Sequence, residues 1–337
     1  MLLSDFDYDL RPELIAQEPL SNRDRSKLLL LNRATGETAH RHFFDLPEYL
    51  RPDDLLVLND TRVTAVRLHG RKPTGGLVEA LLIHNLGGNR WDAVVKPGRR
   101  VNLGHTILFD DLGISAEVVG RSDGGCRILD FGDDPGVCEA IERAGEVPLP
   151  PYISTVLRDK DRYQTVYAAE PGSAAAPTAG FHFTPELLAK IRSMGVRTAF
   201  VTLHVGIATF RPVRTEEIED HVMHYEHISI SPEVAEVINS APGRIISVGT
   251  TTARVLESAA VGKRRVEPID RETNLFVKPG YEFQIMDGLI TNFHMPKSTL
   301  MVLVSTFAGR DSIMSAYKKA AENQYRFLSF GDAMFII

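Results

Sequence analysis

Residues 202–226, TLHVGIATFRPVRTEEIEDHVMHYE, join the end of an apolar, strand-like run to a segment rich in carboxylates and imidazoles. A buried strand leading into a polar tip is typical of α/β folds, whose strand tips carry the chemistry. Five of the eleven histidines fall between positions 182 and 227: His182, His204, His221, His224 and His227. Because imidazole exchanges protons near neutral pH, this density beside carboxylates predicts an acid–base site.

Two other interpretations of this segment stay open. If residues 215–227 form a helix, His221 and His224 border an apolar stripe as structural residues, and that stripe consists of Ile218, Val222 and Tyr225. The two histidines also have the i, i+3 spacing at which helices present metal ligands. A metal hydrolase is therefore an alternative, although the HExxH motif is absent. We predict no metal.

Composition indicates an ordinary soluble protein. The chain has 337 residues, 43% of them hydrophobic and 24% charged, and its length favours two domains. Cys126 and Cys138 lack CxxC spacing, which fits a reducing cytosol. The acidic start has no basic signal-peptide region, and no apolar run could span a bilayer. We expect a cytoplasmic monomer with no membrane partner.

Basic residues are concentrated in one part of an acidic chain. The net charge is −6, yet residues 62–100 hold eight basic groups against Glu79 and Asp92. The eight are Arg62, Arg67, Arg71, Lys72, Arg90, Lys96, Arg99 and Arg100. A local basic surface can bind phosphates. This stretch is compatible with a nucleic-acid partner, with a non-catalytic RNA-binding protein, or with a solvated face that has no partner.

A β-barrel is predicted in the first half of the chain. From about Val63 to Phe131, short β-rich runs alternate with glycine pairs and polar turns at intervals suited to antiparallel strands. Residues 120–124, GRSDG, match the letters of a nucleophile elbow, but no helix follows them, so we expect a hairpin turn. A helical patch at Val137–Ala144 comes next, before a proline-rich return.

Helices and strands alternate from Tyr152 onward, which indicates an α/β sheet. Thr184 before Pro185 is a favourable helix start. Apolar runs predict strands at 27–31, 54–58, 197–205, 244–249 and 289–293. We therefore predict an α/β fold with a main α/β sheet domain and an inserted small antiparallel β-barrel domain. The predicted domains are residues 1–61 with 152–337 and residues 62–151.

The tips of the predicted strands carry further candidates. Parallel strands bring their carboxyl ends to one edge, so we expect His204, Thr250–Thr252 and His294 to face one cleft. Thr250 and Thr251 begin a predicted helix, whose free amides and hydroxyls could bind a carboxylate or phosphate or could simply cap it. GxGxxG and GxxxxGK[ST] are both absent, so neither a dinucleotide fingerprint nor a P-loop is present.

A series of short motifs runs along the chain: NDTRV (59–63), DRYQTVY (161–167), PTAG (177–180), HFT (182–184), LHVG (203–206), IEDHVMH (218–224), VGTTTAR (248–254), TNFHMPKSTL (291–300) and YRFLSFGDAMF (325–335). Together they resemble the S-adenosylmethionine:tRNA ribosyltransferase-isomerase family of queuosine biosynthesis, over the whole chain. Two departures stand out. After LHVG the family text is closer to Ala-Gly-Thr-Phe, whereas this chain has Ile207-Ala208-Thr209-Phe210, and Tyr225 stands where serine is common. If the donor requires close backbone approach at the glycine that is missing here, the local binding geometry of this chain differs from that of the family.

The resemblance implies a reaction in which S-adenosylmethionine donates a ribosyl unit and no methyl group. The acceptor is the aminomethyl group of 7-aminomethyl-7-deazaguanine (preQ1) at wobble position 34 of a tRNA with a GUN anticodon. The ribosyl unit is isomerised, epoxyqueuosine-tRNA forms, and adenine and methionine leave. S-adenosylmethionine is thus a co-substrate, and neither a metal nor a permanently bound cofactor is implied. An α/β domain with an inserted barrel is implied as well.

Catalytic roles can be assigned as hypotheses under this resemblance. The sulfonium makes the adjacent C5′ proton acidic, and His204, His221 or His224 could remove it as the base. Asp60, if protonated, or His294 could assist the departure of adenine by donating to a ring nitrogen. Glu226 could lie beside the cationic donor or the substrate ammonium.

Binding roles are assigned in the same way. Arg62 and Arg254 could meet a phosphate or the methionine carboxylate. Phe181 and Phe210 could stack on a base. The other predicted substrate-binding residues are Tyr163, Thr178, His182, Asp220, Thr250, Thr251, Asn292 and His294.

Overall fold

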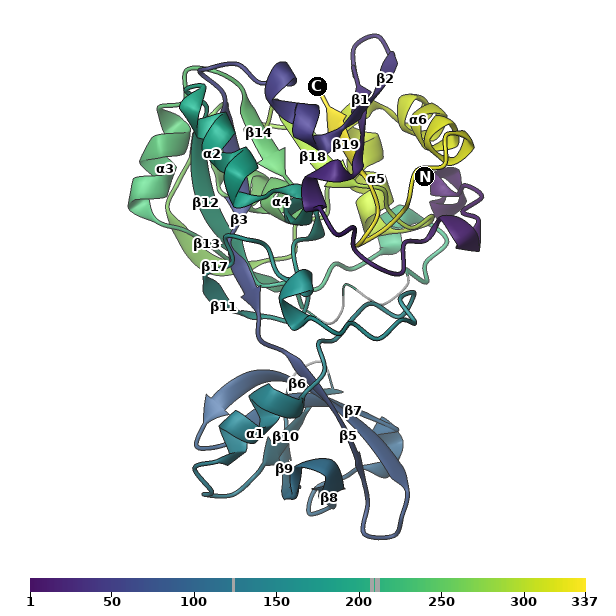
Figure 1. The fold of residues 1–337 in the computed structure, drawn as a ribbon, viewed down its shortest axis with the longest axis vertical. Helices are drawn as coiled ribbons and strands as arrows, with labels where there is room; N and C mark the ends of the chain where they lie inside the picture. Colours follow the sequence, from purple (N-terminus) through teal and green to yellow (C-terminus); the bar gives the residue numbers. More distant parts are fainter. Residues whose placement is uncertain (123–124, 207–208, 210–212) are drawn as a thin grey trace.

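The computed structural model describes residues 1–122, 125–206, 209 and 213–337, and it contains a sheet domain and a closed barrel (Figure 1). One nine-stranded sheet organises the first, with strand order β17-β13-β12-β3-β14-β18-β19-β1-β2. The strands are β1 (Lys27–Leu31), β2 (Thr38–His42), β3 (Leu55–Asn59), β12 (Arg197–Leu203), β13 (Glu226–Ile230), β14 (Ile245–Val248), β17 (Ile269–Thr273), β18 (Gly288–Asn292) and β19 (Ala333–Ile336).

The centre of this sheet is parallel and fully covered. β12, β3, β14 and β18 lie side by side in parallel register. All five residues of β3 are buried, as expected for a parallel strand with both faces covered. Leu55 and Val57 pack into the core on one face, and Leu56 and Leu58 pack into the core on the other. The predicted strands are confirmed to within two residues at each end.

Helices cover both faces of the sheet. One core packs side chains of four helices against one face; the other packs α2 and the 3-10 helix Phe43–Tyr49 against the opposite face. The Thr184 hydroxyl accepts a hydrogen bond from the Leu187 amide and caps α2, as predicted. The helices are α2 (Pro185–Ser193), α3 (Pro232–Asn239), α4 (Thr250–Ser258), α5 (Thr299–Ala308) and α6 (Arg310–Glu322).

The second body is a closed six-stranded antiparallel barrel. Its strand order is β10-β7-β6-β5-β8-β9. Alternate side chains fill its interior, and Val137 and Ile141 of α1 (Val137–Ala144) join that core. The strands are β5 (Val66–Arg71), β6 (Leu77–Gly87), β7 (Arg90–Lys96), β8 (Thr106–Phe109), β9 (Ile114–Arg121) and β10 (Arg127–Asp130). The predicted fold class is confirmed.

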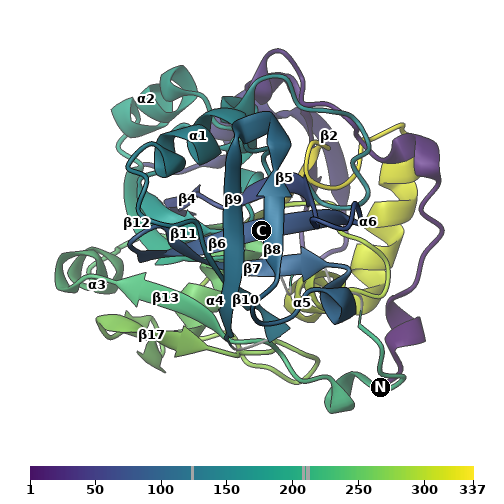
Figure 2. The ribbon, with the colours of Figure 1, turned by 90° about the horizontal axis from the view of Figure 1, so that it is seen from below.

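Two short parallel strands join the bodies. The chain leaves β3 through β4 (Thr61–Val63) into the barrel, and β4 pairs with β11 (Glu170–Ser173) on the way back. The carboxyl ends of the central strands therefore face the barrel, which lies in front of the sheet domain when the molecule is seen from below (Figure 2). The domain boundaries at 61/62 and 151/152 stay a prediction.

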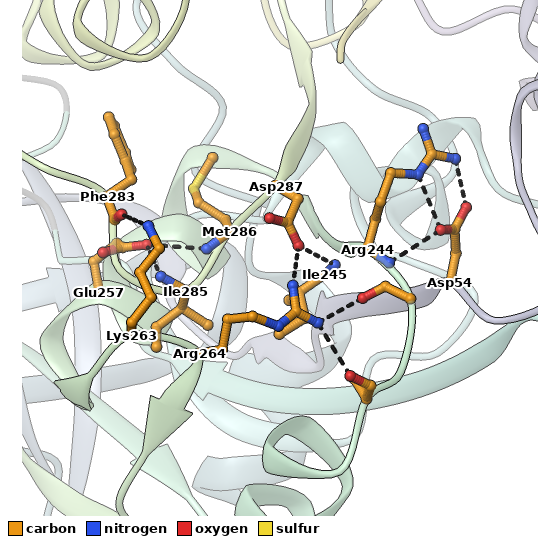
Figure 3. Close-up of polar contacts among 12 residues, drawn as sticks. Asp54, Arg244, Ile245, Glu257, Lys263, Arg264, Phe283, Ile285, Met286 and Asp287 are labelled. Carbon is orange, nitrogen blue, oxygen red and sulfur yellow. Dashed lines mark hydrogen bonds and ion pairs between the residues drawn. The ribbon is translucent and has the colours of Figure 1, made fainter.

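Polar contacts tie the opposite, amino-terminal edge of these strands (Figure 3). Arg244 donates to both carboxylate oxygens of Asp54, from Nε at 3.0 Å and from Nη2 at 2.5 Å. Arg264 donates to Asp287 at 2.5 Å, directly before β18. Glu257 of α4 accepts three consecutive backbone amides. These contacts fix the strand starts and leave the carboxyl edge for a site.

Several local predictions differ from the structure. Residues 215–227 are not a helix: only Ile218–Asp220 forms a 3-10 turn, and β13 begins at Glu226. The proposed stripe is broken because Val222 and Tyr225 are 78% and 64% exposed. Strand β5 was not recognised in the sequence. The hairpin expected at 120–124 has its two strands, β9 and β10, in antiparallel pairing, but residues 123–124 lie outside the described residues.

Candidate active site

A large cavity lies at the carboxyl edge of the parallel strands. Its volume is about 600 Å³, within the range of roughly 300–1,000 Å³ in which proteins hold small organic ligands. Its walls come from the ends of β12 and β18, the start of α4, the segments 150–152 and 175–179, and the segment before β13. Ten predicted site residues line it: Tyr163, Thr178, His221, His224, Glu226, Thr250, Thr251, Arg254, Asn292 and His294.

The start of α4 presents its first backbone amides and the Thr251 hydroxyl to this cavity. Gly249 precedes the helix at φ +95°, a conformation that favours glycine, and no side chain caps the helix. The first amides of a helix have no partner within it, so they remain available to a ligand. The Thr251 hydroxyl oxygen is buried and has no hydrogen-bond partner among the described residues. Together these groups are donors of the kind that can bind an anion.

Arg254 adds to these donors one turn into α4. Its side chain is 7% exposed and forms an ion pair with Glu226, which is 9% exposed. Its Nε donates to the Leu275 carbonyl at 3.2 Å, while its buried Nη2 has no partner in the described part of the chain. Glu226 also accepts the Gly206 amide at 3.0 Å. The carboxylate is thus engaged in positioning Arg254, and the guanidinium keeps a free donor.

His221 and His224 reach the cavity from the loop before β13. The His221 ring packs edge-on against Phe276, with ring centroids 5.6 Å apart. Burial, followed by the neighbouring His224, lowers the pKa of His221 below its usual value. The imidazole is therefore neutral at pH 7 and able to accept a proton.

His294 is a buried, neutral member of the cavity wall. Burial lowers its pKa to about 3, and its Nε2 lies 2.8 Å from the Thr291 hydroxyl. Its backbone amide donates to the Tyr317 hydroxyl oxygen, and its carbonyl accepts from the Tyr8 hydroxyl. Beside it, the Asn292 amide group donates to the Leu328 carbonyl at 3.0 Å. These bonds hold the wall in one arrangement.

His204 does not line the cavity, so the prediction that it shares the cleft with His294 is wrong. Leu203 and Val205 face the core on the cavity side, and alternation along the strand turns His204 to the other face. There its Nδ1 lies 2.8 Å from the Thr61 hydroxyl, and its ring stacks on His227. Gly172 packs so closely on this ring that an added Cβ would lie 3.1 Å from it.

Three further predicted residues, Asp60, Arg62 and Asp220, lie outside the cavity wall. Asp60 accepts from the Thr202 hydroxyl at 2.8 Å, and burial raises its pKa. Arg62 and Asp220 are exposed. Phe210 lies outside the described residues.

Phe181 and His182 lie in a second, smaller pocket. Its volume is about 20 Å³, and Ser329 lines both it and the large cavity. His182 is 4% exposed, its Nδ1 lies 2.7 Å from the Ser26 hydroxyl, and its Nε2 has no partner among the described residues. Burial lowers the pKa of His182 to about 3. Its ring is therefore neutral at physiological pH.

The cavity also contains residues that were not predicted. Among them, Tyr152 bonds Ser329 through hydroxyl groups 2.7 Å apart, and Leu3 comes from the start of the chain. Ser329 belongs to the motif at 325–335, so this motif could have indicated that it lies in the site. Nothing in the sequence connects Leu3 to this site.

Within the described residues, no group of three or more His, Cys, Asp or Glu side chains could hold a metal ion. In the same part of the chain, no helix is long and apolar enough to cross a membrane.

Comparison with known proteins gives the family. A family model described as "Queuosine biosynthesis protein" matches residues 3–336. The chain belongs to this queuosine biosynthesis family. The S-adenosylmethionine:tRNA ribosyltransferase-isomerases of Caldanaerobacter subterraneus subsp. tengcongensis and Symbiobacterium thermophilum are 52% and 51% identical to it, with full coverage of both chains.

A solved structure supports the same family. The S-adenosylmethionine tRNA ribosyltransferase of Thermotoga maritima is 39% identical and matches with a TM-score of 0.57. The match covers 99% of this chain and 100% of that one. The resemblance of the sequence motifs to the S-adenosylmethionine:tRNA ribosyltransferase-isomerase family is thus confirmed.

Proposed function

We propose that this protein is an S-adenosylmethionine:tRNA ribosyltransferase-isomerase. It transfers and isomerises the ribosyl unit of S-adenosylmethionine onto the aminomethyl group of preQ1 at wobble position 34 of a GUN-anticodon tRNA. Epoxyqueuosine-tRNA, adenine and methionine are the products. The observation that carries this conclusion is the full-length identity of about half to enzymes of that name. We further propose that it acts as a cytoplasmic monomer, without a permanently bound cofactor.

The donor would bind in the large cavity with its methionine carboxylate at α4. That carboxylate meets the first amides of the helix, the Thr251 hydroxyl and the free Nη2 of Arg254. A charge-assisted bond from a buried guanidinium is stronger than a neutral one. Because the helix end also favours negative charge, this is the best place in the cavity for an anion.

His221 is our candidate for the base that removes the C5′ proton. It lies on the cavity wall and its lowered pKa keeps it unprotonated at pH 7. His224 lies beside it on the same wall and could share the role. Glu226 is less suited, because its oxygens are engaged by Arg254 and the Gly206 amide.

A single assay tests the proposal. The protein is incubated with S-adenosylmethionine labelled in its ribose and with an anticodon stem-loop carrying preQ1 at position 34. We expect label in the RNA and an equal amount of free adenine. A stem-loop with guanine at that position is the matched control and should give neither. Adenine release without transfer, or transfer of the methyl group, would contradict the proposal.

A further inference from the structure

The small pocket beside the large cavity has an excess of positive charge. Arg23, Arg162 and Arg326 all line it. Arg23 donates to the carbonyls of Gln164 and Asp161 at 2.7 and 3.0 Å, and Arg162 donates to the carbonyls of Ser21 and Leu20. Carbonyl oxygens hold a guanidinium in place without cancelling its charge.

The carboxylates near this pocket compensate its charge only in part. Asp332 lies 3.9 Å from Arg326 Nε. Burial, followed by the neighbouring Arg162, lowers the pKa of Arg23, and the exposed Asp159 and Asp161 offset this only in part. Among the described residues, Arg23 and Arg162 form no ion pair. Two guanidinium groups are therefore kept together with donors to spare.

This contrasts with the basic stretch at residues 62–100. Four of its eight cations are paired with carboxylates in the barrel: Arg67, Arg71, Arg90 and Lys96. Much of the charge that the sequence places there is thus neutralised locally.

The pocket also contains a buried donor position without a partner. His182 Nε2 has no hydrogen-bond partner among the described residues, although its residue is 4% exposed. If the Ser26 hydroxyl donates to Nδ1, Nε2 carries the proton and can donate to an anionic oxygen. The volume of about 20 Å³ holds roughly one water-sized group, so the pocket excludes a base or a nucleoside and has room for a single oxygen of an anionic group.

We propose that this arginine pocket, defined by Arg23, Arg162, Arg326 and His182, binds one phosphate group of the RNA substrate next to the nucleotide that enters the large cavity. The two sites are contiguous because Ser329 lines both. In addition, the ring of Phe181 in the small pocket packs against the ring of Tyr163 in the large cavity, with centroids 5.6 Å apart. The planar fork of arginine matches phosphate oxygens. The assignment rests on the proposed function, since it requires an RNA substrate.

The test measures affinity for the preQ1 stem-loop as a function of salt. Arg23→Gln and Arg162→Gln should each weaken binding about tenfold and reduce the slope of log K against log salt by roughly 0.7 per lost phosphate contact. Arg23→Lys and Arg162→Lys should keep most of the slope, because they keep the charge. Arg271→Gln is the matched control: Arg271 also donates to a carbonyl, that of Ser258, but lies on β17 outside both pockets. It should bind as wild type.

Each alternative has its own signature. Unchanged slopes in Arg23→Gln and Arg162→Gln, with a wild-type enzyme that binds and converts the stem-loop, overturn the phosphate site alone. If the lysine variants lose as much of the salt slope as the glutamine variants, the arginines have a structural role, and the phosphate site is again overturned. A wild-type protein that binds no stem-loop overturns the proposed function and, with it, this site. Titration with inorganic phosphate separates the source: if glutamine variants lose phosphate binding but keep RNA binding, the pocket takes free phosphate.

Discussion

Removing the free donor of Arg254 should weaken the binding of S-adenosylmethionine, and the loss should come only from the contact with the carboxylate of the ligand. Arg254→Met by itself would leave Glu226 buried without its counter-ion, at 9% exposure, and would confuse binding with stability. The useful perturbation is therefore the double variant Arg254→Met with Glu226→Gln, which is neutral at both positions. Glu226→Gln alone is the control for the donor, since it keeps the guanidinium and an oxygen for the Gly206 amide. Because it leaves the buried Arg254 without its counter-ion, its free energy of unfolding is measured beside its affinity.

The magnitude follows from the burial of the donor. Hydrogen bonds to charged groups contribute about 1.5–3 kcal/mol, which corresponds to about 10- to 100-fold in affinity. Arg254 Nη2 is buried and unpaired, so most of that contribution is available to a ligand. The amides at the start of α4 remain in the double variant, so binding should be weakened without being abolished.

Calorimetry with two ligands identifies the group that is recognised. S-adenosylmethionine should bind wild type and Glu226→Gln similarly and the double variant about 10- to 100-fold more weakly. Decarboxylated S-adenosylmethionine lacks the carboxylate and should bind all three proteins with similar affinity. If the double variant loses the same factor for both ligands, Arg254 shapes the cavity and does not bind the carboxylate, and the reasoning fails.

Three further outcomes are expected. Asp54→Asn should lower the free energy of unfolding in urea by roughly 3 kcal/mol, because it breaks a buried ion pair, whereas Asp110→Asn, whose pair is exposed, should cost less than about 1 kcal/mol. His294 is neutral in the fold because its pKa is about 3, so the unfolded chain binds more protons than the folded one between about pH 6.5 and pH 3. The free energy of unfolding should therefore decrease by about 1.4 kcal/mol for each unit by which the pH is lowered in this range. His294→Gln should remove this contribution. His221→Gln should reduce turnover at least a hundredfold, by roughly the general-base contribution, while His204→Gln should leave S-adenosylmethionine affinity within about threefold in equilibrium binding.

The parallel sheet could be predicted because its strands have an unambiguous signal. Runs such as LLVLN have no polar face, which fits a strand covered on both sides and little else of that length. The position of the site at the carboxyl edge follows from the same parallel order. Barrel strand β5, VRLHGR, lacks this signal because its outward residues are polar and one face is in solvent.

Residues 215–227 show why periodicity failed. Ile218, Val222 and Tyr225 have helical spacing, but the backbone here bonds to the start of the chain. Ile218 donates its amide to the Met1 carbonyl, and the Leu3 amide donates to the Glu216 carbonyl. These contacts, made across more than two hundred residues, replace helical bonds, so no local pattern could reveal them. They also explain how Leu3 comes to line the cavity.

The location of charge illustrates a more general limit. Counting basic residues pointed to 62–100, yet Arg71 and Arg90 there are paired with Asp110 and Asp130. Phosphate binding depends on cations whose counter-charge is missing, and pairing is a property of the fold. Arg162 stands inside a motif that the sequence displayed, but only the structure shows that carbonyl oxygens, not carboxylates, hold it. A guanidinium fixed in this way keeps its charge for an incoming anion, which is why we propose the phosphate site at the arginine pocket beside the cavity.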